Sequence, residues 1–159
     1  MGTGTEKIHF RQGRQSDRRD LVRLLASYRM STDINPEDFI VAEVNGKLRG
    51  GARLAWVGAD EAFLRPIVVA TEAQRAGLGR ALLKRLSRVC SRISVIARGD
   101  AVPFYRHLGF TATDWSSVPS EYRDECECCD EMVLCRPISM KWTLNDKGAS
   151  GEQGRQGAS

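Results

Sequence analysis

The chain has 159 residues, 42% of them hydrophobic, and a formal net charge of +4 at pH 7. This is enough apolar material for one sizeable core, so we expect one domain. The modest net charge does not indicate a nucleic-acid binder; there is no apolar stretch of roughly 18 to 20 residues and no signal-peptide pattern at the N-terminus, so we expect a cytoplasmic protein.

The first part of the chain predicts a strand followed by a helix. Apolar and polar residues alternate from Ile8 to Arg11, as in a half-buried strand. Ser16 is a suitable N-cap, with Asp17 in the first turn of a helix that ends near Met30. The apolar face of this helix comprises Leu21, Leu24, Leu25 and Tyr28.

Two further strands follow as a hairpin. The dipeptide Asn45-Gly46 separates residues 39–44 from 47–56, and this dipeptide favours a tight turn in which both residues have positive φ. The next strand, Glu61 to Val69, ends in a continuous apolar run. Such a run is typical of a central strand that is buried on both faces.

The second half predicts two helices and two short strands. An amphipathic helix follows the strand that ends at Val69, and its apolar face comprises Leu82, Leu83, Leu86, Val89 and Cys90. Residues 93–97 form a buried strand. Asp100 can then cap a helix that stops at Gly109, and residues 132–135 form a last strand. The tail, residues 145–159, has almost nothing to bury and is expected to be disordered.

The segment Gln74–Arg80 joins the central strand to the following helix. This geometry points several unpaired backbone N–H groups at one spot, where a phosphate would satisfy them. A side chain at Gly77 or Gly79 would block close approach of the main chain to a pyrophosphate, or forbid a positive φ. For a bare G-x-G, however, an ordinary tight turn is the better interpretation.

The wider sequence around this loop is more specific. Val69–Leu83 resembles the acyl-CoA signature of the GNAT superfamily, Q/R-x-x-G-x-G/A after a strand, and Ala101–Phe110 resembles its second signature, a helix ending in F-Y-x-x-x-G-F. The resemblance covers roughly Ile8 to Phe110. It implies an α/β fold with a mixed, mostly antiparallel central sheet flanked by helices, in a domain over residues 1–144 that includes a cysteine-rich acidic segment, 121–136.

The resemblance also implies a cofactor, acetyl-CoA, and a set of contacts to it. The pantetheine arm would hydrogen-bond the main chain of Ile67 and Val69, much as an added strand does. The pyrophosphate would be held by Gln74, Arg75, Ala76, Gly77, Leu78, Gly79 and Arg80. Family members often have Asn seven residues before the tyrosine of the second signature; this chain has Arg98 there, so that contact is not carried over.

Two residues are candidates for the catalytic steps. Tyr105 corresponds to the family tyrosine that protonates the departing CoA thiolate, and its alternative role is packing. Glu61, at the start of the central strand, is a candidate for deprotonating the amine, although a solvated carboxylate is the simpler interpretation. His9 and His107 are weaker candidates.

Four cysteines lie within ten residues, at Cys126, Cys128, Cys129 and Cys135. The C-x-C-C-x5-C pattern is not a standard zinc spacing, and we assign no metal. A reduced, partly buried loop is the simplest interpretation, with metal binding and redox activity left open.

We therefore predict an N-acetyltransferase acting on a primary amine of a small molecule or amino acid, with no nucleic-acid or membrane partner; a homodimer is left open. The alternative is a non-catalytic acyl-CoA-binding module or a thiol or metal sensor. A third hypothesis is a nucleic-acid-binding module that uses the basic helix from Arg80 to Arg92. It is disfavoured because no aromatic residues accompany the charges.

Overall fold

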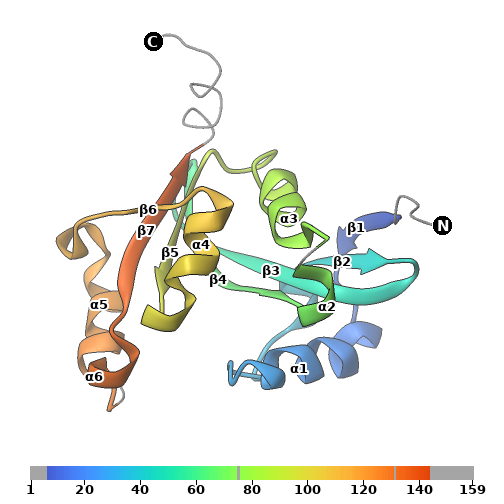
Figure 1. The fold of residues 1–159 in the computed structure, drawn as a ribbon, viewed down its shortest axis with the longest axis horizontal. Helices are drawn as coiled ribbons and strands as arrows, with labels where there is room; N and C mark the ends of the chain where they lie inside the picture. The colour runs from blue at the N-terminus through green and yellow to red at the C-terminus, as the bar shows by residue number, and fades with distance from the viewer. Residues whose placement is uncertain (1–6, 75, 131, 144–159) are drawn as a thin grey trace, which may run out of the picture. The chain divides into compact units, whose positions relative to one another are not determined.

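The computed structural model describes residues 7–74, 76–130 and 132–143 (Figure 1). They divide into two compact units. The first comprises the described residues up to 55 and those between 64 and 88, and the second comprises residues 56–63 and the described residues from 89 onward. Two strands, β3 (Lys47–Gly58) and β4 (Glu61–Val69), run from one unit into the other.

The remaining elements of the first unit are β1 (Ile8–Gln12), η1 (Gln15–Asp17), α1 (Arg18–Ser27), η2 (Pro36–Asp38), β2 (Ile40–Val44), α2 (Thr71–Gln74) and α3 (Leu78–Leu86). Those of the second unit are β5 (Arg92–Ala97), η3 (Gly99–Ala101), α4 (Val102–Leu108), β6 (Thr111–Ala112), η4 (Trp115–Ser117), α5 (Ser120–Glu127), α6 (Met132–Cys135) and β7 (Ile138–Thr143). The strand order is β1-β2-β3-β4-β5-β7-β6. Strands β4 and β5 pair in parallel, whereas β1–β2, β2–β3, β5–β7 and β6–β7 are antiparallel. The predicted α/β fold with a mostly antiparallel sheet is confirmed.

The hairpin prediction is confirmed by the backbone. Asn45 and Gly46 have φ of 52° and 85°, and they connect β2 to β3 in an antiparallel pair. The bounds of β4 are also those predicted from its apolar run. These elements follow from local chemistry, because positive φ at two successive positions is accessible to few residue types.

Two adjacent glycines of β3 show how the helices of the first unit cover the sheet. A Cβ added to Gly50 would lie 3.2 Å from side-chain atoms of both Leu78 and Leu82 on α3. One added to Gly51 would lie 3.3 Å from Leu21 on α1. Because successive residues of a strand point to opposite faces, α1 and α3 cover opposite faces of the sheet here (Figure 1).

The apolar face of α1 forms a core with residues of β2 and β4. Leu21 and Leu25 are fully buried with Phe39, Val41 and Val68. Tyr28 packs against this core through its ring, although α1 ends at Ser27, slightly earlier than predicted. Each fully buried leucine contributes roughly 1.5–3 kcal/mol relative to exposure, so this face fixes α1 on the sheet.

The start of α1 differs from the prediction. Ser16 is exposed within η1, and Asp17 occupies the N-cap position. The Asp17 carboxylate accepts hydrogen bonds of 2.8 and 2.9 Å from the Arg11 guanidinium and one of 2.7 Å from the backbone N–H of Arg14. These bonds, chiefly that from Arg11, lower the pKa of Asp17. The carboxylate thus holds the chain in a 3-10 turn before the helix.

The predicted last strand was wrong. Residues 132–135 form the short helix α6, whose Val133 and Leu134 are 82% and 87% exposed. The last strand is β7, which pairs with β5 from Arg92↔Thr143 to Ala97↔Ile138. A four-residue apolar run does not distinguish strand from helix, whereas the alternation of Ile138, Met140 and Trp142 was a usable strand signal.

The helices on either side of β5 match the prediction only in part. Helix α3 ends at Leu86, so Val89 is 56% exposed instead of lying on its apolar face. Asp100 lies in η3, and α4 begins at Val102 and stops at Gly109, whose φ is +105°. The tail at residues 145–159 lies outside the described residues. No helix in the described part of the chain is long and apolar enough to cross a membrane.

Candidate active site

The loop between β4 and α3 is built from one short helix and a tight turn. Helix α2 follows β4 directly, and Ala76 and Gly77 form the turn that leads into α3. Gly77 has φ +81° and ψ 22°, the left-handed conformation, at the N-cap of α3. A Cβ on Gly77 would meet no described atom within 4 Å. Glycine is therefore required here by its backbone angle, and the space beside its Cα is open.

Several backbone N–H groups of this loop already donate to carbonyl oxygens within it. The N–H of Ala76 donates to Ala73 and that of Gly77 to Gln74, each at 3.2 Å. The helix then begins with the N–H of Ala81 donating to Gly77 at 3.0 Å. By helix geometry the N–H groups of Leu78 and Gly79 have no intrahelical acceptor, so they are donors that this turn presents.

The charges around the helix start favour an anion. Helix α3 has no acidic residue in its first turn, and Arg80 and Lys84 are exposed. The dipole of the helix adds partial positive charge at the same end. On α2, Glu72 is paired with Arg49 at 3.2 Å, which offsets its negative charge. Arg75 lies outside the described residues, so its predicted contact stays a prediction.

The last residues of β4, just before this loop, have backbone groups that point away from β3. Ile67 and Val69 are buried, at 3% and 2% exposure. The N–H of Ala70 donates to Arg49 of β3 at 2.7 Å. Because backbone groups alternate along a strand, those of Val69 and Ile67 point to the edge opposite β3. That is the orientation required for an extended amide-bearing arm to pair with them.

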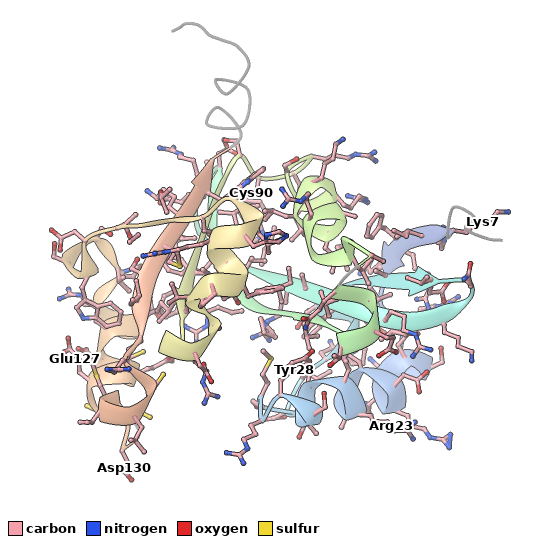
Figure 2. All side chains as sticks on the ribbon, viewed as in Figure 1. Lys7, Arg23, Tyr28, Cys90, Glu127 and Asp130 are labelled. Carbon is pink, nitrogen blue, oxygen red and sulfur yellow. The ribbon has the colours of Figure 1, made fainter. Side chains whose placement is uncertain are left out.

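A tyrosine that the sequence placed only on an apolar helix face connects these parts. The Tyr28 hydroxyl donates to the carbonyl oxygen of Val69 at 2.7 Å and accepts from Gln74 Nε2 at 2.8 Å. Gln74 Nε2 also lies 3.3 Å from the Val69 oxygen, and Thr71 Oγ1 lies 3.3 Å from the hydroxyl. Figure 2 labels Tyr28 just after α1. Two predicted site residues, Val69 and Gln74, are thus brought together by one that was missed.

Tyr105 belongs to the second unit and is buried on α4, at 7% exposure. Its ring makes edge-to-face contacts with Phe104 and Phe110, with centroids 5.2 and 5.4 Å away. Burial raises the pKa of Tyr105 to about 12. The hydroxyl therefore stays protonated across the neutral range and can act only as a donor or neutral acceptor there. His107 is exposed on the same helix.

Glu61 also lies in the second unit, where β4 begins beside Arg92 of β5. Its carboxylate is 3.8 Å from Lys141 Nζ, and both side chains are about one-third exposed, at 34% and 36%. His9, on β1, is exposed. Glu61 therefore has a cationic partner on β7 at the start of β4.

None of the five cysteines, which all lie among the described residues, forms a disulfide. Cys128 and Cys129 are exposed, Cys126 and Cys135 are half-buried, and Cys90 is buried elsewhere. Among the described residues, no group of three or more His, Cys, Asp or Glu side chains is arranged to hold a metal ion.

Comparison with known proteins agrees with this geometry. Residues 35–112 match the model of the acetyltransferase (GNAT) domain. An uncharacterized N-acetyltransferase of Chlorobaculum tepidum is 25% identical over 112 residues, covering 67% of this chain and 71% of its own.

Two solved structures share the fold. N-acetylglutamate synthase from Neisseria gonorrhoeae, complexed with coenzyme A and L-arginine, has a TM-score of 0.69 at 19% identity over 86% of this chain, which spans 33% of the synthase. The ribosomal-protein-S18-alanine N-acetyltransferase from Escherichia coli has a TM-score of 0.59 at 22% identity, covering 87% of this chain and 94% of its own.

Proposed function

Because this chain belongs to the GNAT superfamily of N-acetyltransferases, we propose that it transfers the acetyl group of acetyl-CoA to the primary amine of a small molecule or amino acid. The observation that carries the proposal is the open, left-handed turn at Gly77, which presents the N–H groups at the start of α3 after a buried strand. We assign the activity to a domain of residues 1–144.

The residues of the loop fit the anionic end of CoA. A pyrophosphate would accept from the N–H groups of residues 78 and 79, beside the open space at Gly77 and the exposed Arg80. Arg75 and the remaining loop residues from Gln74 onward complete the proposed contact set. Ile67 would offer both of its outward backbone groups to the pantetheine arm and Val69 its N–H group, and the thioester of acetyl-CoA supplies the activated acetyl group.

Tyr105 is proposed to stabilise the leaving thiolate. A thiol has an ordinary pKa of about 8.5, so complete proton transfer from a phenol with pKa about 12 would be uphill by about 5 kcal/mol. A hydrogen bond from the hydroxyl to the developing negative charge on sulfur has no such cost. Its contribution is then electrostatic stabilisation of the departing thiolate, which takes its proton afterwards from solvent.

Glu61 is proposed to accept the proton that the substrate ammonium must lose before nitrogen can attack the thioester. Glu61→Gln should lower kcat/KM about tenfold, because the amide cannot accept a proton and water would have to take over this role. The pH profile of kcat/KM, recorded for both proteins, measures this. An identical profile for Glu61→Gln would remove Glu61 from the mechanism; Lys141→Met serves as the control for loss of the ion pair alone.

The activity itself is tested by release of free thiol from acetyl-CoA in the presence of a panel of amines, amino acids and basic peptides. The two neighbours named above indicate why the panel must be broad, since one is named for an amino-acid product and the other for a protein alanine acceptor. Turnover with a small amine or amino acid supports the proposal. Binding of CoA without turnover on any acceptor would instead indicate a non-catalytic acyl-CoA-binding module.

A further inference from the structure

We propose that Tyr28 is a positioning residue for the cofactor loop, a role that rests on the proposed function. Its hydroxyl is shared between the end of β4 and the first predicted pyrophosphate contact, as a donor to the Val69 carbonyl at 2.7 Å and an acceptor from the Gln74 amide at 2.8 Å. Tyr28 lies 41 and 46 residues from these partners in the sequence, so the link is purely tertiary.

The ring and the hydroxyl of Tyr28 have separate tasks. The ring packs against the buried core formed by α1, β2 and β4, where Leu25 and Val68 lie. Because the ring is packed against this core, the hydroxyl is held beside the backbone at the end of β4. A phenol suits this use because its apolar ring can be buried while its polar tip reaches a partner at the rim.

The Tyr28 hydroxyl, the Gln74 amide and the Val69 carbonyl oxygen are hydrogen-bonded to one another. A carbonyl oxygen has two lone pairs, and that of Val69 accepts from Tyr28 at 2.7 Å and from Gln74 at a longer 3.3 Å. Without the hydroxyl, the Gln74 amide would keep only the longer bond. The Gln74 side chain would then sample more conformations before the cofactor binds, and ordering it would reduce affinity.

The hydrogen bond from Tyr28 also determines which backbone group of Val69 is available to the cofactor. With its oxygen occupied twice, Val69 offers the pantetheine arm its N–H group, while Ile67 can offer both of its backbone groups. Tyr28 therefore positions the loop, and it also leaves Val69 as a hydrogen-bond donor, not an acceptor, for the pantetheine arm.

The test is a double-mutant cycle on CoA affinity, measured by calorimetric titration. Tyr28→Phe keeps the buried ring and should weaken CoA binding about tenfold, because preorganisation of the loop is lost. Gln74→Ala should have a similar effect. Because both remove the same link, the double variant should again be only about tenfold weaker than wild type, not about a hundredfold.

Two further readouts separate positioning from a purely structural role. In the transfer reaction, Tyr28→Phe should raise KM for acetyl-CoA with little change in kcat, and Tyr122→Phe, on α5, should change neither. A lower melting temperature with unchanged CoA affinity, tighter binding, or additive effects in the cycle would each overturn the inference. If wild type itself does not bind CoA, the proposed function fails and this role with it, whereas a binding wild type with an unaffected Tyr28→Phe contradicts the role of Tyr28 alone.

Discussion

Replacing Gly79 with glutamate is expected to weaken CoA binding by about a hundredfold or more. Gly79 is buried in the first turn of α3, where the N–H groups proposed to hold the pyrophosphate begin. A carboxylate there adds bulk and places like charge beside a phosphate, so both effects oppose binding; a hundredfold is about 2.7 kcal/mol. Calorimetric titration with CoA measures the change.

Two matched variants separate the causes. Gly79→Gln has the size of glutamate without its charge and should lose only about tenfold, so the gap between the two variants measures the electrostatic part. Gly79 has a helical backbone, and neither change forces an unfavourable φ there. Gly77→Ala, by contrast, should cost about 1 kcal/mol of folding stability, because Gly77 has φ +81°. A folded Gly79→Glu protein with unchanged affinity would show that this loop is not the cofactor site.

The second large effect is expected for Tyr105→Phe. Loss of the hydroxyl should lower kcat about a hundredfold, because the thiolate loses its hydrogen-bond donor in the transition state. CoA affinity should change less than about twofold, since the thiol is neutral in the bound cofactor. Phenylalanine preserves the edge-to-face contacts with Phe104 and Phe110, so the fold should be retained. Unchanged kcat would make Tyr105 a packing residue.

The same variant reports on the raised pKa of Tyr105. Tyrosine in the unfolded chain ionises near pH 10, and in the folded protein Tyr105 does so at about 12. The stability that this difference contributes is present below pH 10 and is lost as the pH rises toward 12. Wild type should therefore lose about 1 kcal/mol more unfolding free energy between pH 9 and 11 than Tyr105→Phe. Parallel urea titrations at the two pH values measure this difference.

How far the sequence predicts this molecule depends on how local each feature is. The hairpin at Asn45-Gly46, the bounds of β4 and the stop of α4 at Gly109 were predicted because each is fixed by a residue with unusual backbone freedom or by an unbroken apolar run. The tight turn between β4 and α3 was predicted for the same reason, through Gly77, whereas the binding of a cofactor there stays a prediction.

The features that were missed depend on contacts between distant residues. The start of α1 shifted because Arg11 of β1 holds Asp17, which the pattern around Ser16 does not contain. The role of Tyr28 depends on partners more than forty residues away. In the segment before β7, the apolar residues Val133 and Leu134 are exposed, so a rule that places such residues inside gave the wrong element.

The most direct measurement is a crystal structure of the chain with CoA bound. We predict that the pyrophosphate lies within hydrogen-bond distance of the backbone N–H groups of residues 78 and 79, beside the open side of Gly77, with the pantetheine arm along the outward edge of β4 at Ile67 and Val69. The Tyr28 hydroxyl should still contact Val69 or Gln74 in that complex. A pyrophosphate bound elsewhere on the molecule, with the loop from Gln74 to Arg80 empty, would contradict the central claim.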